Sequence, residues 1–347
     1  MPSPAEITLQ SDALLLRCTP AQGFSIASLV DRISGAEAFW QRPGHTPASC
    51  SRVLGPAGEA SSETFVDLFA GGWFEMFPEV GYTQPGDPAS LVHGEVVRLP
   101  WEVVSTDAEH VEARVACVRR PLTLTRRLTL DGARLHVAER IENVGAAPAP
   151  YTWGHHPCFS RTTFAGGRIE LEAAAATVPE PWFQPESATL AFGDFDWPHA
   201  PARETSAAAH PGGAGPAPVA TTPAHGAAPP AATFDLSQLP VRADGRHDHA
   251  CLTMGSGSFR LIAPDAGPAG RALRIDFDRE RFPYALLWQN FGAGDGFPFW
   301  GAADTFAIEF STMPGRSTPD ALAAGAVSQL HPGEVVETSF TVGWEAV

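Results

Sequence analysis

Two adjacent histidines, His155 and His156, lie within an aromatic stretch at residues 151–159 and directly precede Pro157. A residue before proline adopts an extended conformation, and proline interrupts strand pairing, so we expect His156 at a sheet edge or cleft rim. An imidazole there can titrate near neutral pH and donate a proton. Because neighbouring strand residues face opposite sides, one of the two histidines should be structural. The sequence alone leaves open which one is the acid.

A candidate base, Glu309, lies in the segment 305–311, which reads TFAIEFS. Strand alternation puts its aromatic and branched apolar residues on one face, and Glu309 on the other face among small residues. Small neighbours leave room for a ligand, and partial burial would raise the carboxyl pKa toward that of a useful base. A solvent-facing glutamate on a half-exposed strand is the alternative interpretation.

Two further segments carry aromatic and hydrogen-bonding side chains suited to a sugar. Residues 69–78 form a glycine-rich turn that presents Trp73, and residues 91–103 contain His93 and Arg98. Tryptophan faces stack on the C–H faces of pyranose rings, whereas histidine and arginine can address hydroxyl groups. These residues predict a sugar cleft, although each aromatic residue is equally compatible with a large β core.

The composition limits the class of partner. The 347 residues are 44% hydrophobic, carry a net charge of −16 and contain no lysine. A strongly acidic chain without a basic patch disfavours nucleic acid and anionic membranes as partners. We therefore expect a neutral small molecule as the ligand.

Cysteine spacing and terminal sequence point to an ordinary intracellular protein. The five cysteines are scattered and form no C-x-x-C pair, so neither a zinc site nor a disulfide framework is indicated. The first residues lack the basic and apolar regions of a signal peptide, and no apolar stretch is long enough to span a membrane. We expect a cytoplasmic location.

Short alternating strands must position these residues. The clearest hairpin joins residues 122–130 and 134–142 through an Asp-Gly turn. Other strands are expected at residues 13–17, 111–118, 168–171, 259–262, 273–277, 284–288, 305–311 and 335–342. Many short strands with few helical stretches predict an all-β protein built as a large antiparallel β-sandwich. The one helix expected is short, at residues 319–326.

A low-complexity segment interrupts this pattern at residues 204–233, which are almost entirely Ala, Pro, Gly and Thr. Such a composition cannot bury a core, so we expect a flexible surface insertion. Because strands and motifs lie on both sides of it, we expect residues 1–347 to form a single domain.

Four motifs in order resemble the galactose mutarotase-like superfamily, which includes the aldose 1-epimerases. The first is His93-Gly94 with Pro100-Trp101, and the second is His156-Pro157-Cys158-Phe159, which matches the family's His-Pro-Tyr-Phe except for Cys in place of Tyr. The third is residues 282–288, and the fourth is Ile308-Glu309 followed by residues 319–322 and 330–334. They span roughly residues 70 to 340. The resemblance implies the galactose mutarotase-like supersandwich fold.

It also implies an activity, the interconversion of the α and β anomers of an aldose. Glu309 would remove the proton of the anomeric hydroxyl, and His156 would protonate the ring oxygen. The expected sugar-binding residues are His93, Trp288, His155, Trp73 and Arg98. No metal ion and no organic cofactor is expected.

Two departures from the family pattern concern the sugar. Residues 76–79 read MFPE, where galactose mutarotases carry an Asn-Arg pair, and Arg98 falls one position later than the arginine of hexose-phosphate relatives. Both changes count against galactose and hexose 6-phosphates as substrates.

Three alternatives follow from the same residues. The chain could be a non-catalytic carbohydrate-binding or regulatory protein that keeps the cleft. A glycoside hydrolase or lyase would need a second carboxylate opposite Glu309, for which Asp276 and Asp278 are the nearest candidates. His247, Asp248 and His249 are a weak metal-site candidate, because no further ligand is indicated.

Overall fold

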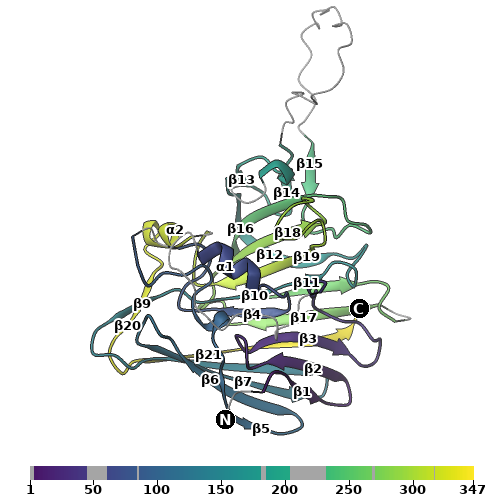
Figure 1. Ribbon diagram of the computed structural model, residues 1–347. Helices are drawn as coiled ribbons and strands as arrows, with labels where there is room; N and C mark the ends of the chain where they lie inside the picture. Colours follow the sequence, from purple (N-terminus) through teal and green to yellow (C-terminus); the bar gives the residue numbers. More distant parts are fainter. Residues whose placement is uncertain are drawn as a thin grey trace, which may run out of the picture.

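The computed structural model describes residues 4–44, 61–83, 86–180, 185–203, 232–267, 270–315 and 317–347. Within these ranges the chain is mostly antiparallel β-structure, with two short α-helices beside it (Figure 1). The prediction of an all-β antiparallel sandwich is confirmed.

The main sheet system contains 17 strands among the described residues. They are β1 (Ile7–Gln10), β2 (Leu14–Thr19), β3 (Ser25–Asp31), β4 (Trp73–Met76), β5 (Glu102–Thr106), β6 (His110–Ala116), β7 (Leu122–Asp131), β8 (Arg134–Asn143), β10 (Gly154–Pro157), β11 (Phe159–Ser160), β12 (Ile169–Val178), β13 (Gly193–Phe195), β16 (His247–Ala263), β17 (Arg271–Phe277), β18 (Tyr284–Phe291), β19 (Asp304–Ser311) and β21 (Val335–Ala346). Two small ribbons pair β14 (His199–Pro201) with β15 (Thr233–Asp235), and β9 (Ala149–Tyr151) with β20 (Ser328–Leu330). The helices are α1 (Ser61–Leu68) and α2 (Thr318–Ala323), with 3-10 turns η3 (Val96–Arg98) and η4 (Pro185–Ser187).

Alternation of apolar and polar residues explains the outer strands. In β7 and β8 nearly every second side chain is buried, and the Asp-Gly turn between them places Gly132 at φ +55°. The ladder then continues from β8 to β21 and from β21 to β17. The buried faces of these strands enclose one large core that contains Trp101, Phe159 and Phe310.

The long strand β16 joins the two parts of the sandwich. Residues 247–253 pair with β18, whereas residues 258–263 pair with β17, and β12 runs along both halves with bulges in its register. Bulges bend a strand, which lets one strand serve two sheets. Next to β18 lie β19, β10 and β4, which position the candidate catalytic residues.

Helix α2 confirms the predicted short helix, beginning one residue earlier and ending three residues sooner. Ser317 caps it, accepting from the Asp320 backbone N–H, while the Asp320 side chain accepts from the backbone N–H of Ser317. Helix α1 was not predicted. Among the described residues no helix has the length and apolar character needed to cross a membrane.

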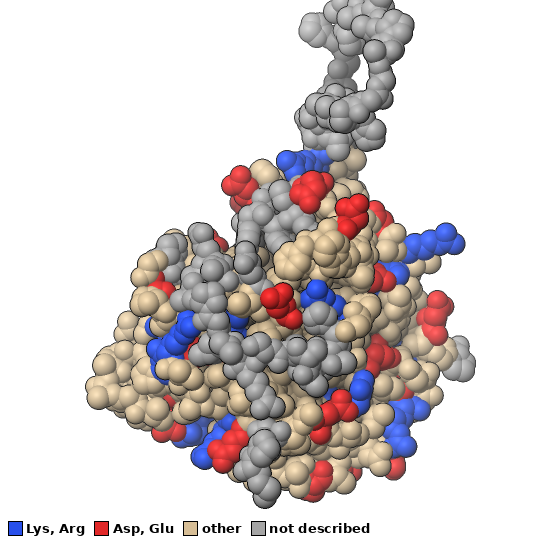
Figure 2. Space-filling view, viewed as in Figure 1, with Lys and Arg blue, Asp and Glu red and all other residues tan. Residues whose placement is uncertain are grey.

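The predicted insertion at 204–233 falls mostly outside the described residues, which resume at Ala232. Its last residue, Thr233, begins β15. On the face seen in Figure 2, Arg and acidic side chains are interspersed among uncharged residues. The single-domain organisation and the exclusion of nucleic acid stay predictions.

Candidate functional site

His156 and Glu309 meet across two neighbouring strands. Strand β10 carries His156 and pairs with β19 at Gly154 and Ser311. His156 Nε2 lies 3.2 Å from Glu309 Oε1, and the two residues are only 6% and 4% exposed. A buried imidazole and a carboxyl group at this distance can pass a proton to each other or to a ligand between them.

The remaining contacts of the His156 ring hold it in place. Phe74 on β4 stacks on it, with ring centroids 4.5 Å apart and planes 23° apart. Cys158 places its Sγ 3.3 Å from His156 Nδ1. The rings of Trp288 and His93 lie 5.5 Å and 5.6 Å away. Only the Nε2 side of the ring therefore faces a ligand.

Burial sets the ionisation of this pair. It raises the pKa of Glu309 well above its usual value. It also lowers the pKa of His156 well below its usual value, with a smaller contribution from repulsion by His93. Both residues thus favour their neutral forms at intermediate pH, and the pair then carries one transferable proton.

The pair opens into a cavity of about 220 Å³. Its described lining comes from α1 and the residue after it, from residues 80–82 and 92–93, from β10, β16, β18 and β19, and from the loops after β18 and β19. The lining residues are Ser62, Phe65, Val66, Phe69, Val80, Gly81, Tyr82, Val92, His93, His156, His249, Leu286, Trp288, Phe297, Phe299, Glu309, Ser311, Met313 and Gly315. Glu309 is the only carboxylate among them, so this described lining lacks the second acid of a typical glycoside hydrolase.

His93 is held by a strained turn at the cavity wall. Its φ is +58°, and Gly94 follows at φ +74°, where an added Cβ would lie 2.3 Å from the Phe77 carbonyl oxygen. Burial and then the nearby Arg98 lower the pKa of His93 to about 3, so the ring stays neutral. Its buried Nδ1 has no hydrogen-bond partner among the described residues, which leaves it available to a ligand.

Trp288 also lines the cavity as expected, and its Nε1 donates to His247 Nε2 at 2.7 Å. His249, two residues further along β16, reaches the cavity itself. The sequence had placed both histidines on one strand face, but as a weak metal site. Asp248 points elsewhere and accepts from the backbone of Thr189.

Arg98 does not line the described cavity, contrary to expectation. It lies in η3 and is 1% exposed. Its guanidinium donates to Thr64 Oγ1 and to the carbonyl oxygens of Ser61 and Val92. It thereby joins α1 to the segment that carries His93, and supports the cavity wall from behind.

His155 and Trp73 also lie away from the cavity, and we correct their assignment as sugar-binding residues. Trp73 is 1% exposed and stacks on Phe340 in the large core. His155 faces the same core, opposite to His156, because neighbouring residues of β10 alternate. The structure thus assigns the two histidines to different environments, and His156 is the one beside Glu309.

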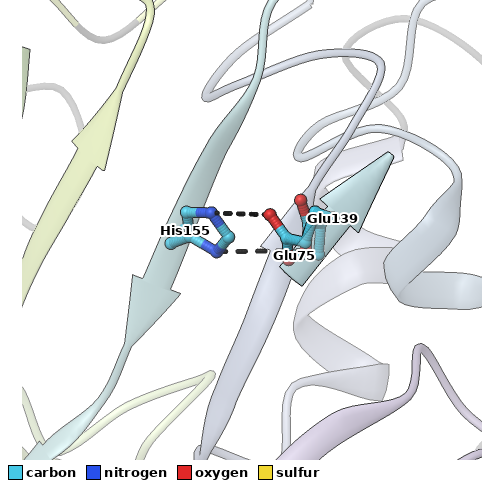
Figure 3. A group of neighbouring side chains, drawn as sticks. All are labelled: Glu75, Glu139 and His155. Atoms are coloured by element: carbon cyan, nitrogen blue, oxygen red, sulfur yellow. Dashed lines mark ion pairs between the residues drawn. The ribbon is translucent and has the colours of Figure 1, made fainter. Parts of the chain in front are cut away.

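His155 belongs to a fully buried group of charged residues (Figure 3). His155 Nε2 lies 3.3 Å from Glu139 Oε2, and His155 Nδ1 lies 3.9 Å from Glu75 Oε2. Arg126 contacts both carboxylates, donating from Nε to Glu139 Oε1 at 2.7 Å. The oxygens and imidazole could ligate a metal ion by type, but the guanidinium already pairs with both carboxylates and would repel a cation. We name these four residues the buried tetrad.

The remaining candidate acids lie in turns and surface pairs. Asp276 forms a salt bridge with Arg274, and Asp278 accepts from the backbone N–H groups of Glu280 and Arg281. Sequence inspection missed the apolar walls, above all Phe65 and Phe69 near α1 and Phe299 in the loop after β18. No helix-start signal was recognised in residues 61–68 of the sequence. The sequence therefore gave no reason to expect these aromatic rings beside His156.

No protein-family model and no curated protein matches this chain. Solved structures match its fold over nearly the whole length. The "putative aldose 1-epimerase" of Escherichia coli K12 is 17% identical, with 99% of both chains covered and a TM-score of 0.62. A galactose mutarotase-like protein of Lactobacillus casei ATCC 334 is 16% identical, with 98% of this chain and 100% of that chain covered and a TM-score of 0.56. At these identities the likeness concerns the fold: the chain has the galactose mutarotase-like fold.

Proposed function

We propose that this protein is an aldose 1-epimerase, which interconverts the α and β anomers of a sugar. The observation that carries the proposal is the buried His156–Glu309 pair, 3.2 Å apart, at the wall of a small cavity. A cavity of about 220 Å³ suits one small molecule such as a monosaccharide. The structural neighbours support the same class of reaction.

The reaction needs one proton removed and one delivered. With Glu309 as carboxylate and His156 protonated at Nε2, Glu309 takes the proton of the anomeric hydroxyl while His156 gives its proton to the ring oxygen. The bond between the anomeric carbon and the ring oxygen breaks, and a free aldehyde forms. Rotation about the bond between carbons one and two exposes the other face. Reclosure returns both protons and gives the other anomer.

The proton shared by Glu309 and His156 makes the ionised pair accessible, with Glu309 as carboxylate and His156 as imidazolium. The neutral pair and the ionised pair differ only by movement of one proton across the 3.2 Å contact. Hydroxyl groups of the bound sugar would stabilise the ionised form, because they can hydrogen-bond to the carboxylate and the imidazolium. Neutral His93 would hold a ring hydroxyl, and Trp288 would contact a C–H face.

The test is anomer exchange on freshly dissolved sugars, measured by polarimetry or exchange NMR. We expect Glu309→Gln and His156→Ala each to lower kcat by about 10²-fold or more. The matched controls Glu337→Gln and His331→Ala change exposed residues outside the described cavity lining, and should leave the rate unaltered. Wild-type rates equal to the spontaneous rate across a broad sugar panel would refute the proposal.

One observation favours a second candidate, a non-catalytic sugar-binding protein. Arg98, expected to bind the sugar, instead supports the cavity wall from behind. A protein that kept the cavity without catalysis would bind sugars with no acceleration of exchange. The same assays separate the two, because binding by NMR is measured beside the rate.

A further inference from the structure

Aromatic rings form much of the cavity wall around His156. Phe69 and Trp288 line the cavity with ring centroids 6.0 Å and 5.5 Å from that of His156. Phe299 continues this wall, 5.7 Å from Phe69. These rings pack together in one buried cluster, so the wall is continuous.

The proposed mechanism places one particular carbon of the substrate against this wall. His156 Nε2 must lie beside the ring oxygen to protonate it. In a hexopyranose the ring oxygen is bonded to carbon five, which bears carbon six, so the carbon-six group lies next to the same imidazole. Phe74 covers one face of that ring and Cys158 its Nδ1 side, which leaves carbon six to meet Phe69 and Trp288.

We infer that the substrate is a 6-deoxyhexose, an uncharged sugar whose carbon six is a methyl group. The inference rests on the proposed function, because it uses the roles assigned to His156 and Glu309. A methyl group packs on aromatic carbon, whereas a hydroxyl group there would lose its hydrogen bonds to water without replacement.

The electrostatics of the cavity also favour an uncharged sugar such as a 6-deoxyhexose. The burial that raises the pKa of Glu309 penalises any negative charge in the cavity, including a phosphate or carboxylate on carbon six. His93, 5.6 Å from His156, competes with this assignment, because its Nδ1 can accept from or donate to a hydroxyl group. Besides His156 and Glu309, the other polar side chains of the described lining are Ser62, Tyr82, His249 and Ser311. The substrate comparison decides between a methyl and a hydroxymethyl group.

The experiment compares sugars that differ only at carbon six. Anomer exchange is measured for D-quinovose against D-glucose, for L-fucose against L-galactose, and for D-glucose 6-phosphate. We expect kcat/KM to favour the 6-deoxy member of the preferred pair by about 10- to 100-fold, and the phosphate to be the poorest substrate. Equal rates within each pair, or a preference for the hydroxylated or phosphorylated sugar, would overturn the inference.

Failure of the proposed function gives a different result. If no sugar exchanges faster than it does spontaneously, the epimerase activity is excluded, and saturation-transfer NMR on the same pairs then tests the ligand class alone. Tighter binding of the 6-deoxy sugars keeps the ligand assignment. Binding without that preference, or no binding to any of these sugars, removes it.

A conservative variant tests the position of carbon six. Phe69→Tyr adds one hydroxyl group to the wall, so we expect the preference for the 6-deoxy sugar to fall several-fold while melting stays close to wild type. Phe192→Tyr makes the same change at an exposed residue outside the described lining and should keep the preference. An unchanged preference in Phe69→Tyr would contradict the placement of carbon six against this ring.

Discussion

The low pKa of the His156 imidazole reflects burial beside a weak hydrogen-bond partner at Nδ1. Its Nδ1 faces the thiol of Cys158, and burial raises the pKa of that thiol well above its usual value, so the thiol stays protonated. A thiol is a poor hydrogen-bond partner and gives an imidazolium little stabilisation. A hydrogen bond to its own backbone raises the pKa of His156 by less than burial lowers it, so the pKa stays low.

This ionisation predicts a bell-shaped dependence of kcat/KM on pH. On acidification the pair gains a second proton at the depressed pKa of His156, so the acid limb lies well below 6.5. On alkalisation it loses its transferable proton at the raised pKa of Glu309, so the alkaline limb lies well above 4.5.

Cys158→Asp should move the acid limb to higher pH, because a carboxylate at Nδ1 stabilises the imidazolium. Cys158→Ser is the control, with a smaller shift; identical limbs in all three proteins would contradict this account.

At the scale of elements, strand β10 separates two kinds of chemistry. Its side toward the cavity carries His156, and its side toward the large core carries His155 within the buried tetrad. The tetrad ties together four strands, β4, β7, β8 and β10, of which β4 also supplies Phe74 beneath His156. Buried charges hold strands firmly only while every partner is present.

Removing one charge from the tetrad should therefore cost much stability. We expect Glu139→Gln to lower the free energy of unfolding by about 3–5 kcal/mol, because Arg126 and His155 each lose a buried carboxylate partner. Glu142→Gln, on the same strand but in a half-exposed pair with Arg140, should cost at most about 1 kcal/mol. Urea unfolding of the two variants measures the difference. Equal losses would show that the tetrad adds nothing beyond a surface pair.

The tetrad also gives stability a pH dependence. Burial opposes the charge of Glu139, but His155 and Arg126 hold its pKa below the usual value. A folded-state pKa lowered in this way contributes stability above the unfolded-state pKa, and the contribution is lost as pH falls through the folded-state value. Wild type should thus lose more stability than Glu139→Gln when urea unfolding is repeated below the usual glutamate pKa of 4.5.

The strands were predictable from sequence where one face is buried and the other is exposed to solvent. Alternation located β7 and β8, and it predicted that only one of the two histidines faces the cleft. Strand β19 was also located, although both of its faces are buried. Alternation could not choose between the two histidines, because that choice depends on which layer lies on each side of β10. Arg98 was misplaced because its residue type suits a sugar site, whereas its guanidinium joins α1 to the segment that carries His93.

At the scale of the whole molecule, the cavity is assembled from segments far apart in the chain. Phe69 follows α1, His156 lies on β10, Trp288 on β18 and Glu309 on β19. The sequence supplied the fold class and the reactive pair through local patterns and a family resemblance. The aromatic wall depends on long-range packing, which no local pattern encodes.

The low-complexity segment should be dispensable for this assembly. Ala202 donates its backbone N–H to the Ala232 carbonyl oxygen at 2.8 Å, and β14 pairs with β15 beside them, so the chain closes before and after residues 204–231. We expect replacement of those 28 residues by about seven Gly and Ser residues to keep exchange activity and to raise the unfolding free energy by about 1 kcal/mol. Calorimetry and the exchange assay measure both. Loss of activity in a stably folded variant would assign the segment a part in catalysis.

The back-to-back histidines of β10 also limit how this protein can evolve. A substitution on β10 alters one side of the strand, but the insertion or deletion of a single residue turns every side chain to the opposite side. Such a change would bring the imidazole of the tetrad to the cavity and drive the other one into the charged core. During evolution, insertions and deletions in β10 can therefore keep both histidines in place only if they come in steps of two residues. The neighbouring loops can change length freely.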